Sequence, residues 1–499
     1  MDKEEAPVMK NWMKITILVV ILGIFITAFI ILSKNTGNQG SDGTSSAEPT
    51  ETPSSADEVD LFDFARDDVT KIILRRADGE IILTKETRAV EKLETDDEGK
   101  KKKVTEEKSV WVNPGFDVDN NKAEDMALTA SNLTTRRLID EHPSDLSIYG
   151  LDKPDVTVFI TSDGKEYGIE IGNETPTKDG YYARKTGSSE VYTINLYHGN
   201  TLKYSKFDIM SKNLYGTDAI TAEDIKSLKL TRSGETVFSA KMGSEPTVWH
   251  LTEPFEWEAE YRELANFLNW LSGFKVSEFT EENAQDLNQY GLDNPKYVFE
   301  YTLNGKDYTL KLGNLKDDQY YGMMNDNGTV FKVDSSSLNF VDTPLINIIS
   351  RFVFLPSIYD VEKVVIEIDG RTDVMDINTS EEADAESDFR LNGRKMETEE
   401  EESLFRKYYQ GVISALADKI DLDANPQGNW FARYTYTMKK ADPDKVVTVE
   451  LIPTEDGYGY YLMKNGRYTG LVMSRRKLDD ESLGIRYHYK NLMDALNKN

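Results

Sequence analysis

Residues 148–160 read IYGLDKPDVTVFI and residues 289–301 read QYGLDNPKYVFEY, so the chain contains one motif twice. The shared core is Tyr-Gly-Leu-Asp-x-Pro, which begins at Tyr149 in the first copy and at Tyr290 in the second. The same spacing holds beyond the motif, because each copy is followed by a strand–turn–strand pattern that closes on a glycine, at Gly172 and at Gly313. Self-similarity at a fixed period indicates a repeat architecture.

A third, degenerate copy follows the first two. Its YYLMKNGRYTGLVM stretch matches the earlier double-tyrosine strands, with Tyr460 in the place of Tyr320. The Tyr-Gly-Leu-Asp motif is missing there, but DVEKVVIEI at Asp360 opens this copy as DVTKIIL at Asp68 opens the first. We therefore predict three modules, at residues 66–215, 216–356 and 357–499.

Each module is predicted to be α+β. Aspartate or asparagine followed by glycine, between runs of alternating apolar residues, is a strong signal for a β-hairpin. Such pairs occur at Asp163-Gly164 and Asn304-Gly305. Helical spacing in the second copy brings four side chains to one face: Tyr261, Leu264, Leu268 and Leu271. These patterns predict an antiparallel sheet with a helix packed on it.

The repeated motif is predicted to form a corner between a short helical turn and the next strand. Its glycine can adopt a positive φ at the end of the turn, and its leucine is expected in the core. Its aspartate suits an Asx turn, and its proline prevents the helix from continuing. A ligand site at this corner is the alternative. The residues of this structural motif are Tyr149, Gly150, Leu151, Asp152, Pro154, Tyr290, Gly291, Leu292, Asp293 and Pro295.

An N-terminal membrane anchor is predicted at residues 15–32. This stretch contains no charged residue, and as a helix it would be about 27 Å long, close to the thickness of a bilayer core. Lys10 and Lys14 precede it, so the positive-inside rule places residues 1–14 in the cytoplasm and the rest of the chain outside. Residues 33–65, rich in Gly, Ser, Thr, Pro and acid, are predicted to be a flexible linker.

Composition excludes several classes of function. The formal net charge is −29 at pH 7, which disfavours binding to nucleic acid. The absence of cysteine excludes disulfides, thiolate nucleophiles and iron–sulfur clusters. The basic run at residues 100–103 is interpreted as a solvated hairpin tip rather than as a docking site for an acidic partner.

No metal site is predicted. Thr398 precedes an acidic run, and Glu401 stands three residues on, which is the capping-box pattern at the start of a helix. Carboxylates are favourable at that end of a helix, so the acidic run at residues 397–402 has a structural explanation. The stretch at residues 117–121 resembles the start of a calcium loop but lacks the following glycine and the spaced glutamate, so a turn is the better interpretation.

No catalytic site or cofactor site is predicted either. The four histidines lie at unrelated positions of the repeat, and neither a Walker loop nor a G-x-S-x-G sequence occurs. Ser474 and Lys477 match the short Ser-x-x-Lys pattern, which arises easily by chance. The double tyrosines could form platforms for sugars. Alternation along a strand instead predicts that one tyrosine of each pair faces the core and one faces out.

The two motif copies, the glycine-closed strands, the double tyrosines and the N-terminal apolar segment together resemble the bacterial domain-of-unknown-function family 4340. The resemblance covers residues 66 to 356, and the last third of the chain departs from the pattern. The family has no established catalytic residues. Its members often resemble companions of ABC-2-type and gliding-motility-type export systems. The resemblance therefore implies an ABC-2-type permease and its ATPase as partners.

The leading hypothesis is a non-enzymatic, membrane-anchored accessory or scaffold protein outside the cytoplasm, associated with an ABC-type export system. The alternative is a binding module for an envelope glycan or another ligand, held in grooves between modules. An envelope hydrolase is a third hypothesis, because the 88 carboxylates offer many pairs that could act on a glycosidic bond.

Overall fold

The computed structural model describes residues 59–499 except 97–98, 100, 382–386, 441–443 and 498–499. The predicted cytoplasmic tail and membrane segment (residues 1–14 and 15–32) lie outside the described residues, as does most of the predicted linker. Within the part of the chain that is described, we find no helix with the length and apolar character needed to cross a membrane.

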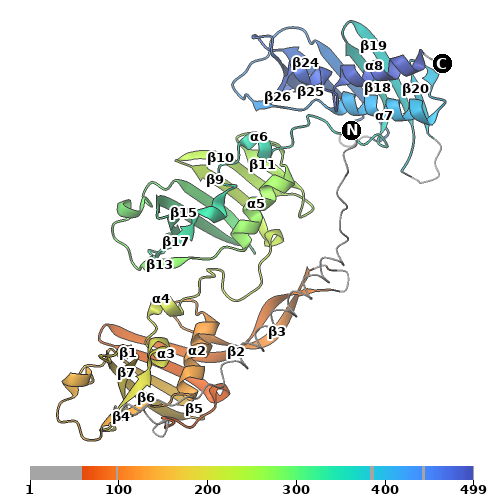
Figure 1. Cartoon of the computed structure of the whole chain (residues 1–499). Coiled ribbons are helices and arrows are strands. Elements are labelled where there is room, and N and C mark those ends of the chain that lie inside the picture. Colours follow the sequence, from red (N-terminus) through yellow and green to blue (C-terminus); the bar gives the residue numbers. More distant parts are fainter. Residues whose placement is uncertain (1–58, 97–98, 100, 382–386, 441–443, 498–499) are drawn as a thin grey trace, which may run out of the picture. The chain divides into compact units, whose positions relative to one another are not determined.

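The first module is an antiparallel sheet of eight strands in the order β3-β2-β1-β5-β6-β7-β8-β4 (Figure 1). The strands are β1 (Val69–Arg76), β2 (Gly79–Thr95), β3 (Lys101–Val112), β4 (Arg137–Asp140), β5 (Val156–Ser162), β6 (Lys165–Glu174), β7 (Gly180–Lys185) and β8 (Val191–Asn195). The helices are η2 (Arg66–Asp68), α2 (Asn120–Ser131), η3 (Leu146–Tyr149), α3 (Leu196–Leu202) and α4 (Lys206–Ile209).

The second module is an antiparallel sheet of nine strands in the order β12-β11-β10-β9-β14-β15-β16-β17-β13. The strands are β9 (Ile225–Arg232), β10 (Glu235–Met242), β11 (Trp249–Glu253), β12 (Trp257–Glu258), β13 (Glu278–Glu281), β14 (Tyr297–Leu303), β15 (Lys306–Lys316), β16 (Gln319–Met324) and β17 (Val330–Asp334). The helices are η4 (Ala222–Asp224), α5 (Tyr261–Ser272), η5 (Asn288–Tyr290), η6 (Ser335–Leu338) and α6 (Leu345–Ile348).

The third module is again a nine-stranded antiparallel sheet, in the order β21-β20-β19-β18-β23-β24-β25-β26-β22. The strands are β18 (Val361–Ile368), β19 (Arg371–Asn378), β20 (Asp388–Leu391), β21 (Arg394–Lys395), β22 (Lys419–Ile420), β23 (Ala432–Met438), β24 (Val446–Pro453), β25 (Gly459–Lys464) and β26 (Arg467–Ser474). The helices are α7 (Glu399–Ile413), η7 (Arg475–Asp479) and α8 (Ile485–Leu496).

The three sheets share one topology. In each, the first strand lies between the second strand and the strand that opens the later meander, as β1 lies between β2 and β5. In each, a short strand that precedes this meander in sequence closes the far end of the sheet: β4, β13 or β22. The α+β class and the three modules are therefore confirmed, and the third module has the same topology although its motif is gone.

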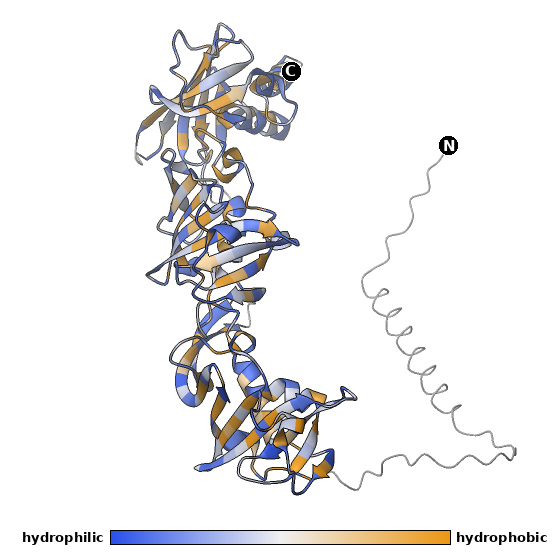
Figure 2. Ribbon diagram, turned by 90° about the vertical axis from the view of Figure 1, so that its left-hand side faces the viewer, coloured by the Kyte–Doolittle hydropathy of each residue, from blue (hydrophilic) through white to orange (hydrophobic). Residues whose placement is uncertain are grey.

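A helix covers one face of each sheet, as the alternation of the strands predicts (Figure 1). Along β5, for example, buried and half-buried residues alternate without interruption, and hydrophobic and hydrophilic residues alternate along many strands in Figure 2. Helix α5 buries Leu264, Leu268 and Leu271 against the second sheet, as their spacing predicted. It also buries Phe267, whose ring meets Phe238 of β10 edge-on at 5.5 Å.

Each module is preceded by a leading segment that pairs with the residues just before the closing strand. Three backbone hydrogen bonds mark this contact at equivalent positions of the repeat: from Thr135 to Val59 (2.9 Å), from Val276 to Lys212 (2.9 Å) and from Ala417 to Arg351 (2.8 Å). In the first module Leu61 also donates to Leu133, and in the third Val353 donates to Ala415. The leading segments thus begin some residues before the predicted module starts.

The long hairpin of β2 and β3 has its predicted form, but not every lysine near its tip is solvated. Lys103 Nζ lies 2.8 Å from Asp224 Oδ2 and 3.4 Å from Glu91 Oε2. The amide of Ala219 also donates to the carbonyl of Glu91 at 2.9 Å. The interpretation of the basic run as wholly solvated was therefore wrong for Lys103, whose partner is far away in the sequence.

Candidate functional site

Both copies of the repeated motif form a corner. The 3-10 helices η3 and η5 each end on a glycine in the left-handed conformation, with φ of 68° at Gly150 and 67° at Gly291. A second glycine lies against each corner, because a Cβ atom at Gly172 or Gly313 would come within 2.2 Å of the carbonyl oxygen of the motif tyrosine. The motif glycine and the closing glycine are therefore required by the same contact, although they are separated in the sequence by a whole strand and a hairpin turn.

The motif tyrosine is held by a carboxylate and by a second tyrosine. Tyr290 donates its hydroxyl to Glu281 at 2.5 Å, and its ring lies 4.9 Å from that of Tyr321. In the first module, Tyr149 donates to Asp140 at 3.2 Å, and its ring lies 5.0 Å from that of Tyr182. In both modules that carry the motif, the second tyrosine of the double pair therefore packs on it.

The first tyrosine of the double pair in the second module, Tyr320, belongs to the main core, as alternation predicted. Its neighbour Tyr321 was expected to face out, but it is half-buried in a small separate cluster. Leu292 is buried in that same cluster with Met323 and Val330, rather than in the main core as expected. The motif thus builds a satellite core under its own corner.

The aspartates and prolines of the motif contribute less specific contacts. Asp293 accepts from the amide of Asn294, the next residue, whereas an Asx turn would use the amide two residues on. The Asx-type bonds lie earlier: the amide of Ser147 donates to Asp145, and the amide of Asn288 donates to Asp286. Pro154 and Pro295 each stand two residues before a strand.

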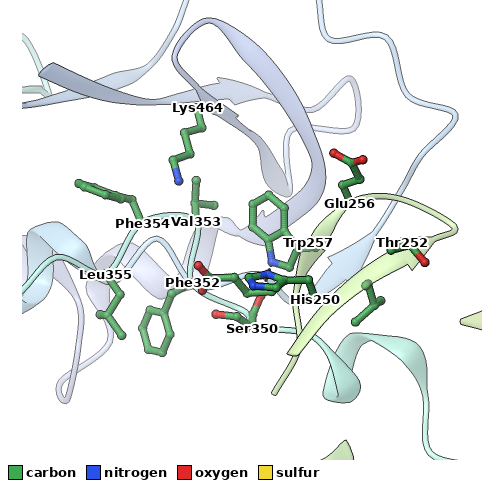
Figure 3. A pocket seen from close by; sticks show the side chains of 12 residues that line it. His250, Thr252, Glu256, Trp257, Ser350, Phe352, Val353, Phe354, Leu355 and Lys464 are labelled. Carbon is green, nitrogen blue, oxygen red and sulfur yellow. Dashed lines mark hydrogen bonds between the residues drawn. The ribbon is translucent and has the colours of Figure 1, made fainter. Parts of the chain in front are cut away.

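A concavity suited to a ligand lies beside β11 and β12. It has a volume of about 730 Å³ and is lined by these strands, by residues 350–355 and by Lys464 of β25. We refer to it as the β12 cleft. Figure 3 shows Lys464 extending toward Val353, with Phe352 and Leu355 on the side away from Thr252. Pockets of this size accommodate a small molecule or a few residues of an extended polymer.

The walls of the β12 cleft are held by backbone pairing. Ser350 donates its amide to the carbonyl of Glu258 at 2.8 Å, and Glu260 donates to Ile348 at 2.7 Å. The indole of Trp257 donates to the carbonyl of Ser350 at 2.7 Å, which fixes the orientation of its ring. The cleft is therefore formed before any ligand arrives.

Aromatic and aliphatic side chains line the cleft, with charged groups at its rim. Phe354 lies 5.1 Å below the ammonium group of Lys464, and Leu355 remains 56% exposed. His250 and Glu258 are directly opposite each other on β11 and β12, so their side chains project on the same side of the sheet. Apolar walls with a few polar groups suit recognition of an amphipathic ligand.

The other candidate groups of the sequence are engaged in structural contacts. The amide of Ser474 donates to Asp418 at 2.9 Å, and Lys477 Nζ lies 3.7 Å from the same carboxylate. His488 is buried and its Nε2 lies 2.8 Å from the carbonyl oxygen of Ser482. In the described parts of the chain, no group of three or more histidines and carboxylates could hold a metal ion.

No local sequence pattern marks the β12 cleft, because most of its lining residues lie in the two stretches that the repeat explains least. Residues 250–258 sit between the tryptophan strand and the helix, and residues 350–355 sit at a predicted module boundary. A weak signal existed in the apolar run FVFL at residues 352–355, which is unusual for a connection between modules.

The comparisons with known proteins bear on the family alone. The family model described as "Domain of unknown function (DUF4340)" matches residues 110–248 and residues 249–424, together more than half of the chain. The second match ends shortly after β22, so the remainder of the third module lies beyond it. The comparisons with curated proteins and with solved structures gave no match.

Proposed function

The chain belongs to the DUF4340 family, and on that premise we propose that it is a non-enzymatic, membrane-anchored accessory or scaffold protein outside the cytoplasm, associated with an ABC-type export system. The observation that carries the proposal is the serial construction of the chain. Three modules of one topology follow one another, and a leading segment pairs by backbone hydrogen bonds with each. Such an array offers successive surfaces to a partner.

The anchor is part of the proposal. Residues 15–32 are apolar and follow Lys10 and Lys14, which supports a single membrane helix with the modules outside. In this arrangement residues 33–58 would separate the membrane from the first sheet. An accessory subunit of this form would act through its contacts with a permease and its ATPase.

Crosslinked affinity purification of the full-length chain from native membranes tests this proposal. Mass spectrometry should find an ABC permease and its ATPase enriched over a control that carries residues 1–58 alone. If neither is enriched over this control, the association with an export system is wrong.

A second function, binding of an envelope glycan or a similar amphipathic ligand, is favoured by the β12 cleft. Its aromatic walls and its rim of Lys464 and carboxylates suit a sugar or a comparable ring system. Binding of soluble cell-wall glycan fragments to the full chain can be measured by quenching of tryptophan fluorescence. Leu355→Ser should weaken binding, whereas Leu315→Ser, at a site that is 53% exposed and outside the cleft, should not. Equal affinities would count against the cleft.

A further inference from the structure

The closing strand of the second module is covered by a segment from the end of the first. Phe279 of β13 is only 6% exposed, and its ring stacks at 5.8 Å on Phe207 of α4. Beside this contact, Lys206 Nζ lies 2.6 Å from Glu282 Oε1. The cover thus consists of a lysine followed by a bulky apolar residue, seated on an apolar residue and a glutamate.

The first module presents the same surface without a cover from the described chain. In the repeat, Leu138 stands at the position of Phe279, and Glu141 stands at the position of Glu282. Strand β4 closes its sheet on β8 as β13 closes its sheet on β17. Yet Leu138 is 39% exposed and the adjacent Ile139 is 36% exposed.

Exposed apolar residues on an edge strand are a liability in a soluble domain. Such strands are usually protected by lysine, proline or a covering segment, since they otherwise pair with other chains. Here apolar residues again lie beside a glutamate, Glu141. In the second module, an apolar residue and a glutamate at the equivalent positions contact the covering segment. The surface therefore has the composition of an interface.

We propose that Leu138, Ile139 and Glu141, which we call the β4 face, bind a short segment of a partner protein in which a bulky apolar residue follows a lysine. The partner segment takes the place that Lys206 and Phe207 take on β13. This inference rests on the proposed function to the extent that the partner is a membrane protein. The positive charge of the lysine in the partner segment is complementary to the charge of the chain, whose net charge is −29.

A second copy of the chain is a poorer occupant than a different protein. Helix α4 already contacts β13 through Phe207. Its counterpart in the third module, α8, packs on α7 and buries Ile485, Leu492 and Leu496. The chain therefore has no spare equivalent of α4 at its described C-terminal end with which to cover the β4 face of another copy.

The location of the β4 face fits a partner on the N-terminal side. Val59 and Leu61 pair with Thr135 and Leu133, a few residues before β4 begins. The chain therefore reaches the first module next to this face. Under the proposed function, this is the module nearest to the membrane along the chain.

Site-specific photocrosslinking in native membranes tests the inference on the full-length chain. A benzophenone amino acid is placed at position 138, or at the control position 128 in α2, where Leu128 is 41% exposed. Position 138 should yield a product with another protein that position 128 does not. The crosslinked peptide should contain a lysine next to a bulky apolar residue. No product, the same product at both positions, or a product with a second copy of the chain would overturn the inference.

Charge and apolar variants then separate this inference from the proposed function. Leu138→Asp and Glu141→Lys should each reduce recovery of the crosslinked protein about tenfold or more, as loss of a central contact does. Leu128→Asp should leave recovery unchanged. If the ABC permease is recovered equally with all variants, the β4 face is not its site while the proposed function stands. If position 138 captures a protein unrelated to export, the β4 face stands and the association with an export system fails.

Discussion

Tyr290 and Tyr321 are in contact, with their ring centroids 4.9 Å apart, and Tyr149 and Tyr182 repeat this contact at 5.0 Å. The two landmarks that recur along the sequence, the Tyr-Gly-Leu-Asp motif and the double tyrosine, are therefore two sides of one packing arrangement. Edge-on and tilted aromatic pairs of this kind add about 0.5–1.5 kcal/mol beyond the area that they bury. The repetition of these residues is explained by the corner without a ligand.

Gly313→Ala should destabilise the corner of the second module. The new Cβ would lie 2.2 Å from the carbonyl oxygen of Tyr290. Moving this backbone atom away costs more free energy than turning a flexible side chain aside. Overpacking of this kind costs roughly 1–3 kcal/mol. The loss of stability is measured by urea denaturation, with hydrogen exchange in peptides from β15 as the local readout. Gly115→Ala is a suitable control, because its Cβ would come no closer than 3.4 Å to a side-chain atom. Equal stability of the two variants would contradict the packing role.

The phenol of Tyr290 should titrate near pH 12. The pKa of Tyr290 is raised from the usual 10.0 to about 12, mainly by its hydrogen bond to the Glu281 carboxylate and to a smaller extent by burial. The neutral phenol is the stabilised form, so this contribution to stability is complete below pH 10 and is lost as the pH rises to about 12. Glu281→Gln should move the pKa of Tyr290 back toward 10. NMR of chains labelled at the tyrosine ζ carbon, with Tyr290→Phe for assignment, measures both values. A wild-type pKa near 10 would show that the bond is not made in solution.

The sequence predicts the modules well because the repeat is carried by local patterns. Hairpin turns at Asp163-Gly164 and Asn304-Gly305, and the helix at residues 261–272, depend on residues that are neighbours in the chain. The antiparallel sheets and the α+β class follow from these patterns. The third module is also recognisable. Because it lacks the motif, it is identified by its double-tyrosine strand and its opening strand.

What the sequence does not predict is what depends on distant partners. The pairing of Lys103 with Asp224 joins residues 121 apart, and the β12 cleft joins strands to a segment nearly a hundred residues later. No local period marks either of them. The exposed Leu138 is similar: its hydrophobicity predicts burial, and only the contact between Phe279 and Phe207 indicates what would bury it.

Asp373→Ala should strongly destabilise the third module. Its carboxylate is buried and accepts from Arg371 Nε at 3.1 Å, from the Tyr408 hydroxyl at 3.1 Å and from Asn392 Nδ2 at 2.9 Å. Each buried donor left without its acceptor, the Tyr408 hydroxyl and the Asn392 amide, costs about 1–3 kcal/mol, whereas Arg371 keeps a second carboxylate partner in Asp369 at 3.3 Å. Urea denaturation with hydrogen exchange in peptides from α7 measures the loss.

A control for Asp373 lies nearby on the same strand. Asp376 pairs with Lys363 at 3.5 Å, and both side chains are 44% exposed. Exposed pairs of this kind contribute at most about 1 kcal/mol, since water and salt screen them. Asp376→Ala should therefore leave the third module nearly as stable as the wild type. A similar loss in both variants would mean that burial of Asp373 does not determine its contribution.

At the start of α7, the contributions of two capping hydrogen bonds to stability can be measured separately. Thr398 Oγ1 accepts from the amide of Glu401 at 3.2 Å, as the capping box predicted. The return bond differs, because the Glu401 carboxylate accepts from the amide of Glu397 at 2.7 Å rather than from that of Thr398. Glu401 is 3% exposed, so its carboxylate is a buried part of the cap.

Thr398→Ala should reduce the stability of the third module by about 0.5–2 kcal/mol, whereas Thr398→Ser, which keeps the accepting oxygen, should be nearly neutral. Glu401→Gln keeps an acceptor for the amide of Glu397 but removes the negative charge that the start of a helix favours. It should therefore cost less than Glu401→Ala, which leaves that amide without its bond. Hydrogen exchange in peptides spanning residues 397–413 measures all four variants. Equally fast exchange in Glu401→Gln and Glu401→Ala would show that the charge, which both variants remove, and not the bond to Glu397, holds the cap together.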